Sequence, residues 1–200
     1  YYAIRAFLQI VSHSTKYGEE PCAECIEIAD WPDQEMRVIF WRMDNYRETK
    51  PDINMIKHYI YTAIAGTRYN TLVFMMRGAI KYNSHPELAL GGAFTREEFK
   101  DIVAFARLHY LEPIPGMDTP GHADWIVNIH PEFAELNNRT ICTRNPDALK
   151  LTYDIADEMI ELCGGIGNVR YFHAGHDEVR WRIFTPAPYI KFRDECPRCK

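Results

Sequence analysis

The sequence predicts an α/β fold built on parallel strands, because strand-like and helix-like segments alternate along the chain. Short apolar runs rich in β-branched and aromatic residues are followed by segments whose apolar residues recur at helical spacing. Polar residues that can carry chemistry come directly after these apolar runs, which is where parallel sheets place functional groups. Together these observations favour a single domain with right-handed βα crossovers.

Four strands are predicted. They lie at residues 37–44, 70–76, 111–115 and 169–178. The third contains Pro113 and Pro115, and proline cannot donate the backbone hydrogen bond expected of a central strand. This segment therefore departs most from a strand pattern, and residues 118–122 are expected to form a loop after it.

Three helices are predicted beside these strands. The first covers residues 49–66, with apolar residues at helical spacing and Gly66 at its end. The second opens with a capping box at Thr95–Glu98. The third begins at Asn145-Pro146 and ends at Gly164-Gly165.

The composition argues against two classes of partner. With 46% hydrophobic and 26% charged residues, the chain is that of a globular protein able to bury a sizeable core. Its formal net charge of -5 and the lack of a basic run with interleaved aromatic residues argue against nucleic acid. No apolar run approaches the roughly 20 residues of a membrane-spanning helix. We therefore expect neither nucleic acid nor a membrane as a partner, and the oligomeric state stays open.

The ends of the sequence and its cysteines are informative in a different way. The sequence starts without Met, so we expect a fragment, with residues 1–29 as a lead-in segment or the tail of a preceding module and residues 30–200 as the main domain.

Two CxxC pairs, Cys22 with Cys25 and Cys196 with Cys199, have the spacing of zinc-binding knuckles. Ribbon-type zinc sites normally close a much shorter loop, so a disulfide, a redox pair or ordinary thiols are the alternatives.

The predicted strand at residues 169–178 ends in a glycine, a histidine and two adjacent carboxylates, Asp177 and Glu178. Neighbouring residues of a strand point to opposite faces, so both carboxylates serve one site only if the backbone leaves strand geometry, which Gly175 allows. Repulsion between adjacent carboxylates favours one protonated and one ionised group, which suits a general acid beside a charged stabiliser. A solvated acidic pair in a loop is the alternative interpretation.

Two histidines add to this constellation. His122 follows a Pro-Gly turn after the third predicted strand, where an imidazole can hydrogen-bond a catalytic carboxylate, although a single histidine is more often structural. His176 adjoins the carboxylates, and with Asp118, His122, Asp177 and Glu178 it offers metal-ligating groups. No spacing typical of a metal site supports that combination, so neither a metal nor another cofactor is expected.

Taken together, these segments resemble the paired signature of glycoside hydrolase family 20, the β-N-acetylhexosaminidases. The signature residues are Pro115–His122 and, about fifty residues later, His173–Val179. Further matches are Asp30–Pro32, Arg37, Asp44, Arg47, Tyr69–Asn70 and His85–Leu88. The resemblance covers residues from about 30 to 179 in the order of the family.

The resemblance implies a (β/α)8 TIM-type barrel, of which this chain would hold about the first four βα units. It implies removal of terminal β-linked N-acetylhexosamine from an oligosaccharide or glycoconjugate. The acetamido oxygen of the sugar attacks its own anomeric carbon, and the configuration is retained. The family also favours a secreted or periplasmic location.

The same match implies roles for individual residues. Asp177 would orient and stabilise the acetamido group, and Glu178 would be the acid/base. Arg37 would hold sugar hydroxyls. His122 would belong to the hydrogen bonds behind the acid. We also expect Asp118 and His176 to support this site, His176 because it adjoins the two carboxylates.

Three positions differ from the family pattern. The family usually has Glu where Gly116 stands and Gly where His176 stands, and it has an aspartate after the second strand that is not found near Met76-Arg77-Gly78. A glycosidase for another sugar and a non-catalytic carbohydrate-binding barrel are therefore alternatives.

Four strands of a barrel also leave two unpaired edges, so we expect residues 1–200 alone to be poorly stable, self-associated or inactive.

Overall fold

The computed structural model describes residues 1–16, 18–22, 27–43, 48–135, 139–177 and 179. The strands are β1 (Val38–Arg42), β2 (Thr71–Met75), β3 (Glu112–Thr119) and β4 (His173–Gly175). The α-helices are α1 (Tyr2–Ser14), α2 (Ile53–Tyr59), α3 (Arg96–Leu108), α4 (Asp124–Val127) and α5 (Pro146–Leu162). α2 continues into a π turn at Ile60–Ile64 and a 3-10 turn at Ala65–Thr67, and further 3-10 turns lie at Arg77–Ala79, Pro86–Leu88 and Pro131–Phe133.

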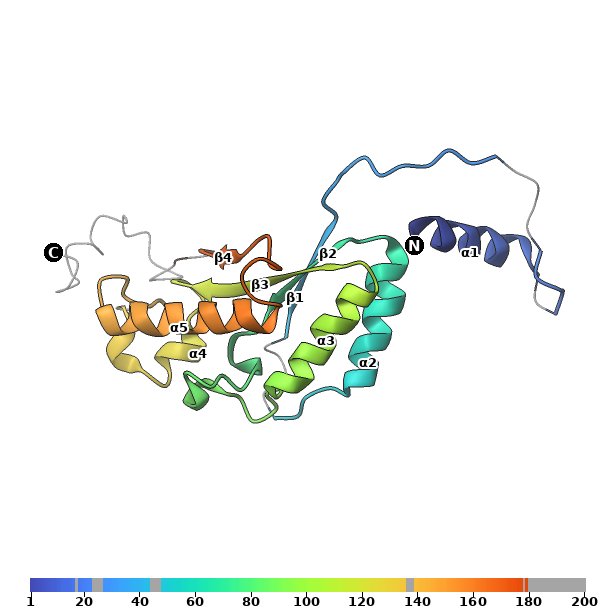
Figure 1. Ribbon diagram of the computed structural model, residues 1–200. Helices are drawn as coiled ribbons and strands as arrows, with labels where there is room; N and C mark the ends of the chain where they lie inside the picture. Colours follow the sequence, from blue (N-terminus) through green and yellow to red (C-terminus); the bar gives the residue numbers. More distant parts are fainter. Residues whose placement is uncertain (17, 23–26, 44–47, 136–138, 178, 180–200) are drawn as a thin grey trace, which may run out of the picture.

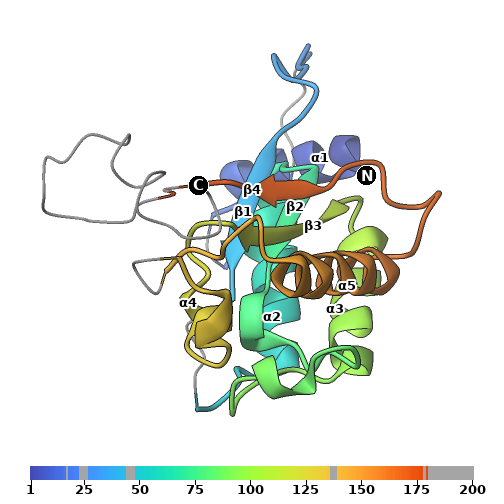
Figure 2. The same ribbon diagram turned by 90° about the vertical axis from the view of Figure 1, so that its left-hand side faces the viewer.

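The four strands form one parallel sheet in the order β1-β2-β3-β4. Helices α2, α3 and α5 all lie on one face of this sheet (Figures 1 and 2). The expected alternation of strands and helices is therefore confirmed. Because all four strands run the same way, the residues that follow them gather at one edge, which we call the carboxyl edge.

The two faces of the sheet differ in how well they are covered. Phe74 of β2 packs edge-on against Phe99 of α3, and Trp41 of β1 packs against Tyr59 of α2. On the other face, Phe40 of β1 remains 44% exposed. We call this second surface the open face.

β3 accommodates its prolines because of where their missing N–H groups would point. The N–H of Glu112 donates to the carbonyl of Asn70 at 2.8 Å, so the N–H groups of alternate residues of β3 face β2. Pro113 and Pro115 lie between these residues and face the β4 side, where pairing begins only at Gly116. The prolines therefore remove no hydrogen bond of the sheet.

The expected loop at residues 118–122 needs a correction, because β3 runs on to Thr119 and includes Asp118. The fourth strand is shorter than expected, since Val169 pairs with Ile166 instead of with β3. The expected starts of the helices after β2 and β3 are confirmed: the capping box at Thr95 is present, and Asn145 caps α5.

The N-terminal segment forms a helix that the sequence pattern did not reveal. α1 lies beyond the amino end of the strands (Figure 1). Arg5 donates to the carbonyl of Tyr61, and Tyr1 packs on Tyr110. Across the described part of the chain, no helix combines the length and the apolar character needed to cross a membrane.

Candidate active site

The carboxyl edge of the sheet holds a buried ion pair. Asp118, near the end of β3, accepts from Arg77 at 3.0 Å (Nε) and 2.5 Å (Nη2), both to Oδ2. The side chains are 6% and 7% exposed. Sequence analysis gave Asp118 a place in the site but not Arg77, because residues 77 and 118 become neighbours only when β2 and β3 pair.

His122 and Asp177 meet across the ends of β3 and β4. Nε2 of His122 lies 3.7 Å from Oδ2 of Asp177, within ion-pair range but beyond a hydrogen bond. The imidazole is 14% exposed, whereas the side chain of Asp177 is 71% exposed. Nη2 of Arg139 lies 3.5 Å from Nδ1 of His122. The two halves of the sequence signature are therefore adjacent in space.

The backbone leaves strand geometry at the end of β4, which is the condition that sequence analysis set for both carboxylates to serve one site. Gly175 has φ +72° and His176 has φ +66°, and the N–H of His176 donates to the carbonyl of Thr119 at 3.0 Å. A Cβ at Gly175 would lie 2.3 Å from the carbonyl oxygen of Met117. Only glycine fits at this approach of β4 to β3.

Gly116 lies on the open face of β3, aligned with Met75 of β2 and His173 of β4. A Cβ there would lie 3.2 Å from both Cε of Met75 and Cγ1 of Val73. A side chain at position 116 would therefore press on Met75 and Val73, which would have to shift to make room.

The structure brings Asp118, His122, His176 and Asp177 together at the carboxyl edge. Glu178, the expected acid/base, lies outside the described residues, as do Asp44 and Arg47. The remaining expected site residue is Arg37, which stands elsewhere.

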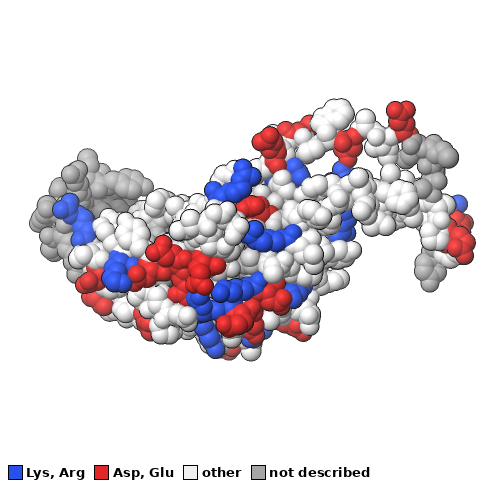
Figure 3. Space-filling model, viewed as in Figure 1, with Lys and Arg blue, Asp and Glu red and all other residues white. Residues whose placement is uncertain are grey.

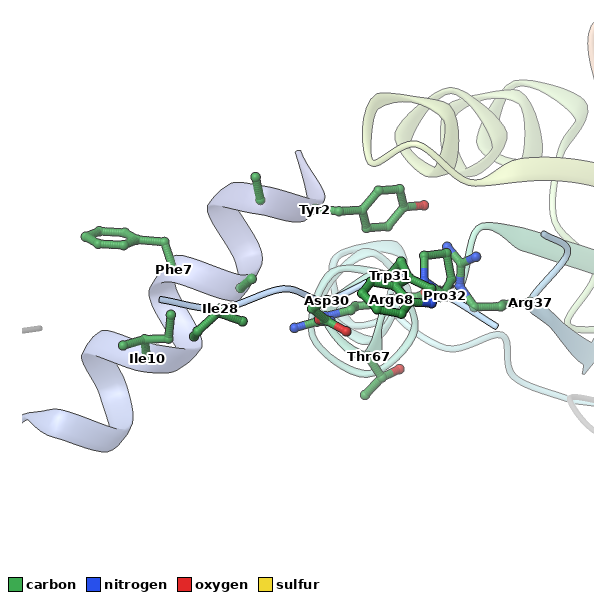
Figure 4. Close-up of a pocket in the computed structure, with 12 residues that line it drawn as sticks. Tyr2, Phe7, Ile10, Ile28, Asp30, Trp31, Pro32, Arg37, Thr67 and Arg68 are labelled. Carbon is green, nitrogen blue, oxygen red and sulfur yellow. Dashed lines mark hydrogen bonds and ion pairs between the residues drawn. The ribbon is translucent and has the colours of Figure 1, made fainter. Parts of the chain in front are cut away.

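Arg37 precedes β1 and lies at the amino end of the sheet, which differs from its expected role in the site. Its Nε donates to the carbonyl of Arg68 and its Nη1 to that of Gln34, both at 2.8 Å. It borders a cavity of about 600 Å³ between α1 and the segment before β1. Figure 4 shows Arg37, Arg68 and Asp30 toward one end of this cavity and Phe7 and Ile10 of α1 toward the other. This cavity lies at the opposite edge of the sheet from His122.

Sequence analysis missed Arg42, the last residue of β1. It aligns with Met75, so it reaches the carboxyl edge, and its exposed side chain shares the open face with Phe40. The alternation of side chains along a strand could have revealed it, because residues 40 and 42 lie on the same face, opposite Trp41.

Two loops at the carboxyl edge carry the same His-Pro-Glu turn. In each turn Nδ1 of the histidine lies near its own glutamate, at 3.1 Å for His85–Glu87 and 3.2 Å for His130–Glu132. Nε2 of His130 also lies 3.1 Å from Oε1 of Glu87, which joins the turns. Burial opposes ionisation of Glu87, but its backbone hydrogen bond and the two imidazoles hold its pKa below the usual value. The loops after β2 and β3 are therefore joined by the contact between His130 and Glu87.

The described residues of the site include no cysteine and no arrangement of side chains suited to a metal ion. In the described part of the chain, Cys22 and the buried Cys142 and Cys163 form no disulfide bond, and burial raises the pKa of Cys163 to about 12. Cys25, Cys196 and Cys199 lie outside the described residues, so the zinc hypothesis stays a prediction. Within the described residues, no group of three or more His, Cys, Asp or Glu side chains is arranged to hold a metal ion.

Comparison with known families decides the broader assignment. The sequence model for "Glycosyl hydrolase family 20, catalytic domain" matches residues 64–196, well over half of the chain. The chain belongs to glycosyl hydrolase family 20. This confirms the resemblance drawn from the two signature segments.

Curated relatives carry matching names. Beta-hexosaminidase subunit A1 of Dictyostelium discoideum is 29% identical over 183 residues, which cover 83% of this chain and 33% of that protein. Hexosaminidase D of Bos taurus is 36% identical over 92 residues, which cover 44% of this chain and 25% of that protein. The chain thus spans a third or less of the length of these relatives.

Solved structures show the shared fold. A beta-N-acetylhexosaminidase from Bacteroides fragilis matches 99% of this chain and 40% of its own, with a TM-score of 0.71 at 23% identity. Flavobacterium johnsoniae chitobiase matches 85% of this chain and 26% of its own, with a TM-score of 0.64 at 25% identity. The expected fold class, part of a TIM-type α/β barrel, is confirmed.

Proposed function

We propose that the protein containing this chain is a β-N-acetylhexosaminidase and that residues 30–200 provide the N-terminal half of its barrel. The observation that carries the proposal is the meeting of His122 and Asp177 at 3.7 Å in a member of family 20. Residues 1–29 would be a lead-in segment or belong to a preceding module. The substrate class is terminal β-linked N-acetylhexosamine, as the names of the relatives suggest.

The proposed reaction uses the acetamido group of the sugar. Glu178 protonates the glycosidic oxygen while the acetamido oxygen attacks the anomeric carbon, which releases the aglycone and leaves an oxazolinium ion. Asp177 stays ionised and stabilises the positive charge that develops on the acetamido nitrogen. Glu178 then takes a proton from the water that opens this ion, so the β configuration is retained.

His122 would hold Asp177 in position. Arginine only donates, so the contact from Arg139 makes Nδ1 of His122 an acceptor and leaves the proton of the neutral ring on Nε2. That proton faces Asp177. Closing the 3.7 Å gap when substrate binds would make this contact a hydrogen bond.

Arg42 is the better candidate for contact with sugar hydroxyls. It ends β1 at the carboxyl edge and its side chain is exposed, whereas Arg37 is held by backbone carbonyls at the amino edge. The role that the resemblance gave to Arg37 therefore suits Arg42.

A non-catalytic carbohydrate-binding barrel is the second candidate. The observations that favour it are the buried cation Arg77 beside the site and the family aspartate that is not found near Met76-Arg77-Gly78. A substrate series with the whole protein separates the candidates. The proposed function predicts release of p-nitrophenol from its β-N-acetylglucosaminide and not from its β-glucoside. The reverse preference would indicate another glycosidase, and binding of N-acetylglucosamine without any hydrolysis would indicate the binding barrel.

A further inference from the structure

Arg77 occupies an unusual backbone conformation at the carboxyl edge. Its φ of +45° is in the left-handed region, which non-glycine residues rarely adopt. The hydroxyl of Tyr82 donates to its carbonyl at 2.8 Å. Gly78 packs against the next loop so closely that a Cβ would lie 2.6 Å from the carbonyl oxygen of Leu88. The surroundings thus hold Arg77 in a conformation that its own sterics oppose.

Left-handed residues gather where the site is. The described non-glycine residues with positive φ are Arg68, Arg77, Tyr110, His122 and His176. Arg68 and Tyr110 end helical segments ahead of β2 and β3, which is a common place for this conformation. The other three follow β2, β3 and β4 at the carboxyl edge. Strain of this kind is typical of functional sites.

The charge of the Arg77–Asp118 pair is coupled to the site by close packing. The ideal Cβ position at Gly175, two residues before Asp177, lies 3.1 Å from Cα of Asp118. Both members of the pair are almost fully buried, so water screens them poorly. Together they are nearly neutral, but either one alone would leave a full buried charge close to the ends of β3 and β4, which lead to His122 and Asp177.

We propose that Arg77 is a positioning residue of this site: it neutralises Asp118, fixes the end of β3 that leads to His122, and keeps the segment that carries Asp177 free of a net neighbouring charge. This inference rests on the proposed function for its catalytic consequence. Its structural part, the electrostatic influence of Arg77 on His122, can be measured without turnover.

The test compares single and double substitutions in the whole protein. Asp118→Asn leaves the positive charge of Arg77, so the basic limb of the kcat/KM pH profile should move to lower pH. Arg77→Met leaves the negative charge of Asp118, so the limb should move to higher pH. The expected size is about one pH unit, as for a unit charge at ~10 Å with an effective dielectric of ~20. The double variant should return the limb to its wild-type position with a lower kcat.

A second readout needs no activity. The titration of His122, followed by NMR of ¹⁵N-histidine-labelled protein and assigned with His122→Gln, should shift to lower pH in Asp118→Asn. Folded single variants whose limb and His122 titration both stay within about 0.2 units of wild type would overturn the proposal. A shift in the His122 titration, measured in a protein without hydrolytic activity, would support the role proposed for the Arg77–Asp118 pair and refute only the proposed function.

A conservative variant covers the case in which the single variants do not fold. Arg77→Lys keeps the charge but loses the two-pronged contact with Asp118. The proposal predicts an unchanged pH limb and a kcat reduced about tenfold or more. Wild-type kcat in Arg77→Lys would contradict a positioning role.

Discussion

Glu158 on α5 holds Ser84 of the loop after β2 through two contacts, accepting from its backbone N–H at 3.1 Å and from its hydroxyl at 2.7 Å. It also accepts from the N–H of Asn83 and pairs with Arg96. Figure 3 shows basic and acidic side chains interspersed over α3 and α5. Most of those groups are exposed, but the side chain of Glu158 is only 7% exposed. A single carboxylate therefore anchors the loop that begins at Arg77.

Replacing Glu158 should destabilise the protein, because its loss leaves two backbone N–H groups and Arg96 without their buried acceptor. We expect Glu158→Ala to lower the free energy of unfolding by about 3 kcal/mol. Glu161→Ala is the matched control. Glu161 lies on α5 like Glu158 and also pairs with Arg96, but its side chain is 55% exposed. The control should cost less than about 1 kcal/mol. Urea unfolding measures both, and equal losses would contradict the anchoring role.

The contribution of Glu158 should depend on pH. Burial raises its pKa, but the N–H groups of Asn83 and Ser84, the Ser84 hydroxyl and Arg96 outweigh burial and hold the pKa below the usual 4.5. A lowered folded-state pKa gives stability that is complete above about pH 4.5 and is lost as the pH falls through the folded value. The difference between wild type and Glu158→Gln should therefore shrink below that pH. A difference that grows on acidification would contradict this.

Gly175→Ala should disrupt the joint between β3 and β4. Alanine would combine a left-handed φ with a Cβ placed 2.3 Å from the carbonyl oxygen of Met117. We expect a loss of about 3 kcal/mol in unfolding free energy. Gly165→Ala is the control, because Gly165 has φ +78° and nothing within 4 Å of its Cβ position. It should cost about 1–2 kcal/mol from backbone strain alone. Similar losses in the two variants would show that the close approach is unimportant.

His176→Gly should stabilise the protein, since glycine accepts the φ of +66° that His176 is forced to adopt. Relief of about 1–2 kcal/mol of strain exceeds the added chain entropy, for a net gain of up to about 1 kcal/mol. His176→Ala keeps the strain and should give no gain. Thermal unfolding separates them, and a gain in the alanine variant would point to the imidazole instead of the backbone.

Several features could be predicted from the sequence because they depend on local patterns. The capping box at Thr95, the cap at Asn145 and the turn at Gly175 each follow from residue types at fixed spacing. The parallel order of the strands followed from their alternation with helices. These local rules also place Asp118, His122, His176 and Asp177 after strand ends, and the structure has them at one edge of the sheet.

Other features arise only from tertiary structure. Arg77 and Asp118 are 41 residues apart, so nothing in either segment reveals their pairing. β3 can extend through Asp118 because its pairing with β4 begins only at Gly116. The nitrogens of Pro113 and Pro115 face that side, so no hydrogen bond is required of them. Arg37 was expected in the site because it matches the sugar-binding arginine of the family. In the structure Arg37 precedes β1 at the amino edge, whereas Arg42 ends β1 at the carboxyl edge.

The exchange of Arg42 for Arg37 can be tested by kinetics. Arg42→Ala should lower kcat/KM for a β-N-acetylglucosaminide about 10–100-fold through loss of a charged hydrogen bond, with little change in stability. Arg37→Ala should lower the melting temperature and leave KM near wild type, because Arg37 bonds to backbone carbonyls at the amino edge. The opposite pattern would restore Arg37 to the site.

The most direct test of the proposed mechanism is the rate of p-nitrophenyl β-N-acetylglucosaminide hydrolysis by the whole protein, measured for wild type, Asp177→Asn and Glu178→Gln. We predict that each substitution lowers kcat by about 10²–10⁴-fold while the protein stays folded, because each removes a group that acts in the transition state. Equal hydrolysis by wild type and Glu178→Gln would contradict the account.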